Sequence, residues 1–142
     1  MTTPLYSHAM SVPFQDIDAA GIVFFARVFD YFHNAFVAHL RACGINMATE
    51  MVKEDSVGPL VHVEADYKSP MRFGDDVCVD ILSAEVKETS FTLHYQIVSQ
   101  TSPQCLFCTG KLVHVTIDRR TWKPCPVPIS LRAAYRADAK GV

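Results

Sequence analysis

The chain has 142 residues, of which 49% are hydrophobic and 20% charged, and its formal net charge is −2 at pH 7. This length and composition predict one globular domain over residues 1–142, long enough to bury a core. The weak negative charge argues against nucleic-acid binding. No apolar run reaches the roughly 18 residues that span a bilayer, and residues 1–10 lack the basic and apolar segments of a signal peptide. A cytoplasmic protein that makes no use of the membrane is expected.

A first strand is predicted over residues 5–14, and an acidic loop follows it. Asp16 and Asp18 lie in this loop, and Gly21 would let a backbone or a ligand approach closely. The loop leads into a helix, whose N-terminal N–H groups can hold an anion or polarise a carbonyl. From the residues alone two interpretations stay open: the aspartates cap the helix, or one of them is a reactive carboxylate beside a set of donors.

The helix after this loop has large apolar side chains at steps of three and four residues, which places them on one face. About 18 residues of helix would span roughly 27 Å, and Gly44 is suited to end it. Such a helix requires a broad apolar partner, because short helices are marginal alone in water. The residues expected on this face are Phe25, Phe29, Phe32, Phe36 and Leu40.

Shorter elements fill the rest of the chain. A second helix that begins with Asn46 as its cap is expected at residues 46–54, and a final helix at 131–140. Period-two alternation predicts four further strands, and the first of these reads as half-buried. The four strands cover residues 60–67, 77–87, 91–98 and 105–117.

The order of these elements predicts an α+β fold. Short turns between strands imply antiparallel pairing, and one face of the sheet must be covered. The phenylalanine-lined helix is the only predicted element long enough to cover it. A five-stranded antiparallel sheet wrapped around one long central helix is therefore expected. An open sheet edge is a liability in water, so oligomerisation through an edge is physically sensible.

The five cysteines do not predict a metal or redox site. Cys105 and Cys108 form a CxxC pair, but a zinc site needs two further ligands at suitable spacing, and a thioredoxin-like pair opens a helix. The residues around this pair alternate like a strand instead. Reduced cytosolic thiols are the expected state.

Two motifs connect this chain to a known family. The first is DIDAAGIVFF at residues 16–25, and the second combines Tyr67, Pro70, Gly74 and Asp75. With the predicted fold, they make the chain resemble the hotdog-fold acyl-CoA thioesterases of the 4-hydroxybenzoyl-CoA thioesterase family, over about residues 5–128. The resemblance implies hydrolysis of an acyl-CoA to the free acid and CoA, with no metal and no redox cofactor. It also implies a homodimer or homotetramer with active sites at the dimer interface.

The resemblance carries roles for particular residues. It makes Asp18 the catalytic carboxylate, acting either as a nucleophile or as a general base, and it makes the backbone N–H of Phe25 the donor that polarises the thioester oxygen. Asp16 is then a capping or loop-shaping residue. The CoA-binding basic run of the family is reduced here to Lys87, with Lys68 or Arg72 as substitutes. The expected substrate-binding residues are Gly21, Phe24, His62, Lys68 and Lys87.

The acyl group is less strongly specified. Aromatic residues beside the loop and the segment 59–63 make the chain look closest to 1,4-dihydroxy-2-naphthoyl-CoA hydrolases, and aromatic walls suit a flat ring. The alternatives are a short- or medium-chain acyl-CoA thioesterase, a hydratase or dehydratase on the same fold, and a non-catalytic acyl-binding module. In the last case Asp18 would only cap the helix.

Overall fold

The computed structural model describes residues 3–53 and 55–140. Helix α1 (Arg27–Ala42) is the longest helix among them, and α2 (Met47–Lys53) and α3 (Ile129–Lys140) are shorter. A 3₁₀ turn, η1 (Phe14–Asp16), precedes α1. The strands are β1 (Tyr6–Ser11), β2 (Ser56–Val57), β3 (Leu60–Tyr67), β4 (Asp76–Val86), β5 (Ser90–Ser99), β6 (Leu106–Val115) and β7 (Ile117–Asp118).

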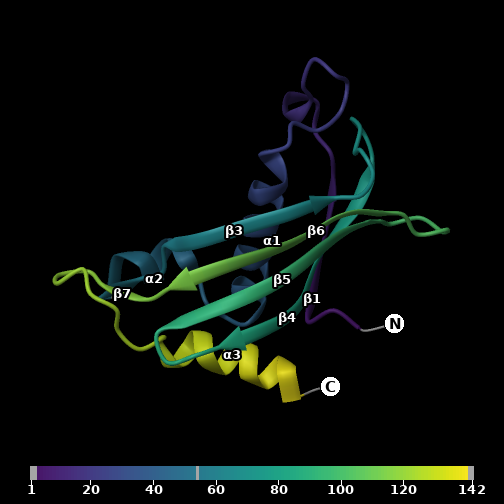
Figure 1. Ribbon diagram of the computed structural model, residues 1–142. Coiled ribbons are helices and arrows are strands. Elements are labelled where there is room, and N and C mark those ends of the chain that lie inside the picture. Colours follow the sequence, from purple (N-terminus) through teal and green to yellow (C-terminus); the bar gives the residue numbers. More distant parts are fainter. Residues whose placement is uncertain (1–2, 54, 141–142) are drawn as a thin grey trace.

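Five strands form one antiparallel sheet in the order β1-β4-β5-β6-β3. Helix α1 runs behind this sheet (Figure 1), so the predicted α+β architecture is confirmed. The strands β1 and β3 are the two edges. The short strands β2 and β7 pair separately beside the start of β3, so the expected strand over 105–117 is divided into β6 and β7.

The core lies between α1 and the inner face of the sheet. Phe32 is fully buried and stacks on Tyr95 at a ring-centroid distance of 4.8 Å. The Phe32 ring lies directly over Gly110 of β6, where any Cβ would collide with it. A glycine at this position therefore lets the helix approach the sheet closely.

The predicted helices are largely confirmed, with one correction at the start of α1. Gly44 ends this helix with φ +86°, and Asn46 Oδ1 accepts the N–H of Ala48 at 3.0 Å to begin α2. However, α1 starts at Arg27, so Phe25 precedes the helix and is 62% exposed instead of lying on its buried face. The carbonyls of Phe24 and Phe25 are held by hydrogen bonds from Arg27 and Tyr67 instead.

The prediction that the strand 60–67 is half-buried is wrong for the single chain. All residues of β3 except Ala65 are exposed, including Val61 and Val63 at 60% and 43%. The alternation of apolar and polar residues correctly predicted a strand here, but it did not show that β3 lies at the edge of the sheet. There α1 does not cover it, and its apolar side chains remain accessible.

Candidate active site

Asp18 opens a tight turn in the loop between β1 and α1. Its carbonyl accepts the N–H of Gly21 at 3.0 Å, and its Oδ1 accepts the N–H of Ala20 at 2.8 Å. Gly21 has φ +82°, a conformation that favours glycine, and the space where its Cβ would lie is open. The other carboxylate oxygen of Asp18 makes no hydrogen bond to any described residue. It is therefore available to a substrate or a water molecule.

Asp16 has a different environment from Asp18. The hydroxyl of Tyr31 donates a 2.6 Å hydrogen bond to Asp16 Oδ2, and Arg27 Nε lies 3.6 Å from Oδ1. Burial, and then the hydrogen bond to Asp16, strongly raise the pKa of Tyr31, so that hydroxyl keeps its proton. Asp16 thus anchors the loop to α1, as a loop-shaping residue would.

Neither aspartate caps α1. Its N-cap residue is Ala26, and no side chain makes a capping hydrogen bond there. The capping interpretation of Asp16 and Asp18 is therefore wrong. In the first turn of α1, the N–H groups of Arg27 and Phe29 are instead bonded to the carbonyls of Phe24 and Ala26.

Two peptide groups at this helix start are held in fixed orientations. The carbonyl of Phe24 accepts the N–H of Arg27 at 2.9 Å, and the carbonyl of Phe25 accepts the hydroxyl of Tyr67 at 2.6 Å. In a planar trans peptide the N–H points opposite to the carbonyl. The N–H groups of Phe25 and Ala26 are thereby directed away from these contacts, and neither has a hydrogen-bond partner within residues 3–53 and 55–140.

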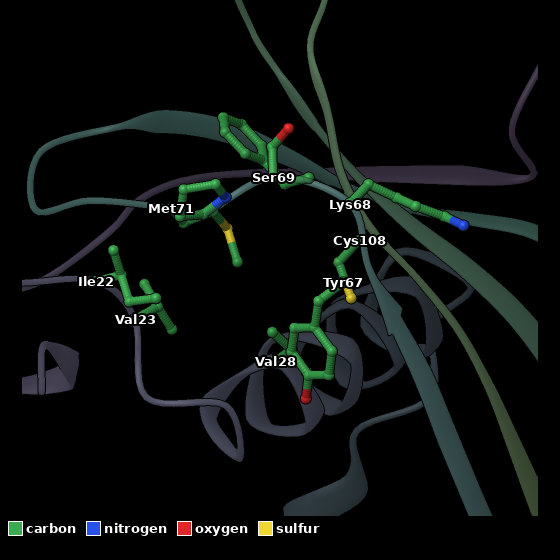
Figure 2. Close-up of a pocket in the computed structure, with 10 residues that line it drawn as sticks. Ile22, Val23, Val28, Tyr67, Lys68, Ser69, Met71 and Cys108 are labelled. Atoms are coloured by element: carbon green, nitrogen blue, oxygen red, sulfur yellow. The ribbon is translucent and has the colours of Figure 1, made fainter. Parts of the chain in front are cut away.

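A pocket of about 250 Å³ adjoins this helix start. Figure 2 shows Ile22 and Val23 on one side and Tyr67 and Cys108 on the other. Burial raises the pKa of the Cys108 thiol to about 12, so this cysteine stays protonated at neutral pH and is a poor nucleophile. The carboxylate of Asp18 lies in the adjoining loop.

The structure gathers part of the predicted site at one place. Asp18, Gly21, Phe24 and the N–H of Phe25 belong to the loop and helix start, and Lys68 lines the pocket beside them. The rings of Phe24 and Phe25 lie 4.8 Å apart and are 42% and 62% exposed, so they offer an aromatic surface there. Sequence reasoning missed the role of Tyr67, although the second motif already contained this residue.

Two predicted binding residues lie elsewhere in the single chain. His62 is on the outer face of the sheet, where its Nε2 is 2.8 Å from Glu64 Oε1. Lys87 lies in the β4–β5 turn, at the opposite end of β4 from Asp76. A second outer-face pair joins His94 to Glu85 at 2.7 Å. Because neither histidine–glutamate pair faces α1, neither provides a hydratase-like pair at the loop.

Among residues 3–53 and 55–140, no group of three histidine, cysteine, aspartate or glutamate side chains is placed to hold a metal ion. The five cysteines are free thiols. None of the helices in this described part is long and apolar enough to cross a membrane.

Known proteins resemble this chain in sequence and fold. The model of the thioesterase-like superfamily matches residues 12–135. A 1,4-dihydroxy-2-naphthoyl-CoA hydrolase from Rippkaea orientalis is 31% identical over 124 residues, which are 87% of this chain and 90% of that protein. The crystal structure of a 1,4-dihydroxy-2-naphthoyl-CoA thioesterase from Synechocystis has a TM-score of 0.86 at 25% identity, covering 92% of this chain and 95% of that one. A gentisyl-coenzyme A thioesterase gives 0.77 at 28% identity, covering 91% and 98%.

The fold and these comparisons therefore define a hotdog-fold thioester hydrolase that acts on acyl-CoA. The chain belongs to the thioesterase-like superfamily, and the family resemblance carried by its two motifs is confirmed.

Proposed function

We propose that the protein hydrolyses an aromatic acyl-CoA, of the 1,4-dihydroxy-2-naphthoyl or 4-hydroxybenzoyl type, with Asp18 as its catalytic carboxylate. The observation that carries this proposal is the helix start. There, the oriented N–H groups of Phe25 and Ala26 have no hydrogen-bond partner among the described residues, and the loop that precedes them carries Asp18 with one carboxylate oxygen unengaged. A donor and a base or nucleophile at one place are what acyl transfer requires.

The N–H groups act on the thioester carbonyl. As the carbonyl carbon is attacked, negative charge develops on its oxygen, and donors already fixed in position stabilise that charge without reorganising. The hydrogen bond from Tyr67 to the carbonyl of Phe25 provides this fixation. One such donor is worth on the order of 10²–10³ in turnover.

Asp18 can serve by either of two routes. As a general base it takes a proton from water while the water oxygen attacks the carbonyl carbon, and the tetrahedral intermediate then expels CoA thiolate. As a nucleophile its oxygen forms a mixed anhydride and releases CoA, and water then hydrolyses the anhydride. Both routes give the same free acid and CoA, and both need the carboxylate charge.

An aromatic acyl group is supported by two observations. The exposed rings of Phe24 and Phe25 adjoin the loop, and flat rings gain about 0.5–1.5 kcal/mol from stacking beyond the area they bury. The similar proteins named above carry the names of 1,4-dihydroxy-2-naphthoyl-CoA and gentisyl-CoA enzymes.

The functional unit in this proposal is a dimer joined through the β3 edges, alone or within a tetramer. β3 presents unpaired backbone groups at the sheet edge together with the exposed Val61 and Val63. An open edge of this kind invites pairing with a second chain. Antiparallel pairing of two β3 strands would continue the sheet and cover these valines.

The test compares CoA release by wild type, Asp18→Asn and Asp16→Asn on 4-hydroxybenzoyl, 1,4-dihydroxy-2-naphthoyl, phenylacetyl, short-chain and long-chain thioesters. Asparagine at position 18 keeps an oxygen that can accept the Ala20 N–H, so the turn is retained while the charge is lost. Asp18→Asn should lose at least about a hundredfold in turnover and unfold at the wild-type temperature. Asp16→Asn is the matched control, and it should lower stability more than turnover because Asp16 binds Arg27.

The outcomes separate the alternatives. Rapid turnover of aromatic thioesters with an inactive Asp18→Asn supports both the reaction and the residue. Preference for straight chains would refute the aromatic substrate while leaving thioester hydrolysis intact. An Asp18→Asn variant as active as wild type would restrict Asp18 to shaping its turn.

A further inference from the structure

Strand β1 has one side of its backbone unpaired, at the edge of the sheet opposite to β3. Within the described residues it pairs with β4 alone, in a continuous register without a bulge. The N–H of Val12, just beyond the strand, donates to the carbonyl of Asp75 at 2.9 Å, so the even-numbered residues of β1 are the ones bonded to β4. The N–H and C=O groups of the odd-numbered residues therefore point to the open edge. These residues are Ser7, Ala9 and Ser11.

The β1 edge lacks the features that keep edge strands from pairing with other chains. Such strands are commonly blocked by lysine, proline, a bulge or an inward-pointing charge. The six residues of β1, YSHAMS, include neither lysine nor proline, and the side chains on the outer face of the strand are small. An unblocked row of donors and acceptors is suited to an extended main chain, because pairing satisfies both kinds of group at once.

An open groove of about 620 Å³ lies beside this edge, between β1 and helix α1. Figure 1 shows β1 running alongside α1. A strand added next to β1 would direct every second side chain over the groove, because side chains alternate between the two faces of a sheet. The residues that line it, all of them at least partly accessible, are Tyr6, His8, Asn34, Val37, Ala38, Arg41 and Ala42.

Arg41 determines the charge of this groove. Its side chain is exposed, and its guanidinium makes no hydrogen bond or ion pair with any described residue. No aspartate or glutamate lines the groove. A carboxylate is the fitting partner, because arginine binds it through two parallel hydrogen bonds. Val37 and Ala38 add apolar surface for an aliphatic side chain in the same groove.

A second copy of this chain is a poor occupant of the β1 edge. The proposed dimer uses the β3 edges, so the two β1 edges lie at the far ends of its continuous sheet. Pairing of β1 with β1 of another dimer would leave a new free edge on every dimer added, and growth would continue. Two grooves brought together would also present Arg41 to Arg41. A different protein therefore fits this edge better.

We propose that β1 and the groove beside it form a docking site for an extended acidic segment of another protein, which adds to the sheet as a further strand. The main chain of this segment pairs with Ser7, Ala9 and Ser11. One of its carboxylates binds Arg41, and an aliphatic side chain on the same face packs in the groove. The inference goes beyond thioester hydrolysis, and it places the partner at the sheet edge opposite to the proposed dimer interface.

The test uses a synthetic peptide, acetylated and amidated TVTETVT, whose valines and glutamate share one face of a strand. Titrated into isotope-labelled wild type, it should shift the NMR amide signals of Ser7, Ala9 and Arg41 and leave those of β3 unchanged. The matched peptide TVTKTVT should bind about threefold more weakly, which is the scale of an exposed ion pair. Equal affinity for the two peptides, or shifts at β3 instead of β1, would overturn the proposal.

Two variants separate the charge from the main-chain pairing. Arg41→Glu should reverse the preference, so that TVTKTVT binds more tightly than TVTETVT. Arg120→Glu changes an exposed arginine outside the groove, so it is the matched control and should keep the wild-type preference. Ala9→Pro removes an N–H that points to the open edge, where proline is tolerated. It should abolish binding of both peptides while the melting temperature and CoA release stay at wild-type values.

Each variant can also refute its part of the proposal. Wild-type affinity in Ala9→Pro would exclude main-chain pairing at β1, and an unchanged preference in Arg41→Glu would exclude the contact with a carboxylate. Light scattering tests the other occupant of the edge. If wild type forms assemblies that Ala9→Pro reduces in size, β1 pairs copies of this chain and the proposal fails. None of these readouts depends on turnover, so they stand apart from the test of the proposed function.

Discussion

The hydroxyl of Tyr67 donates a 2.6 Å hydrogen bond to the carbonyl oxygen of Phe25. This contact joins the end of the edge strand β3 to the residues that precede α1, which are 42 positions away in sequence. Burial, and to a lesser extent the neighbouring Cys108, raise the pKa of Tyr67, so the donor stays protonated. The contact fixes the peptide that presents the Ala26 N–H.

Replacing Tyr67 by phenylalanine should therefore impair turnover more than folding. We expect kcat of Tyr67→Phe to fall about tenfold, since one hydrogen bond that orients a donor is lost. The melting temperature should change little, because the side chain is 51% exposed. Tyr6→Phe is the matched control, since no hydrogen bond of the Tyr6 hydroxyl occurs in the described part of the chain. Equal kcat in wild type and Tyr67→Phe would contradict this role.

Tyr31→Phe should lower stability by about 1–3 kcal/mol, because it removes a hydrogen bond to the carboxylate of Asp16. Tyr31 is 2% exposed, so in the variant little water can reach Asp16 Oδ2 to replace the lost hydrogen bond. Urea unfolding at pH 7 measures the change. The same substitution in an Asp16→Ala background should cost much less, and equal costs in both backgrounds would show that the bond does not anchor the loop.

Gly110→Ala should be destabilising by about 1–3 kcal/mol or more, since the new methyl group would collide with the Phe32 ring. Combining it with Phe32→Leu should cost less than the sum of the two single changes, because the smaller side chain frees that space. Thermal unfolding of the four proteins in this cycle provides the measurement. Strict additivity would mean that the ring does not limit position 110.

The stability of the protein should rise with pH up to about 6.5, partly through His114. Burial lowers its folded-state pKa below the ordinary value of 6.5, so the unfolded chain takes up a proton first as the pH falls. The stabilisation is complete above that value and is lost below it. Glu64 and Glu85 also have lowered pKa values, but their ordinary value of 4.5 places their effect at lower pH. In His114→Phe, urea unfolding should show a smaller rise over this range.

Val63→Asp should convert the proposed dimer into monomers and abolish thioester hydrolysis with it. Val63 is 43% exposed on the edge strand β3, and a charge on an edge strand opposes pairing. Ala9→Asp on β1, the opposite edge, is the matched control and should retain the dimer. Light scattering and CoA release measure both properties. A fully active monomer would refute a site shared between two chains.

Local pattern predicted most of the fold. The steps of three and four around Phe32 and Phe36 predicted the central helix, Gly44 and Asn46 correctly marked helix ends, and alternation correctly predicted the strands. The two motifs also led to the family. The turn at Asp18 and Gly21 is a local feature, because it depends on the side-chain oxygen of Asp18 as an acceptor and on the positive φ of Gly21.

Sequence therefore determined the elements, the thioesterase family and the loop that holds Asp18. Only the tertiary structure decided that Phe25 is exposed, that β3 is an edge, and that Tyr67 contacts Phe25. Periodicity shows which side chains share a face of one element. Which faces become covered, and which distant atoms meet, depends on how the elements pack together, and that packing joins residues that no local pattern relates.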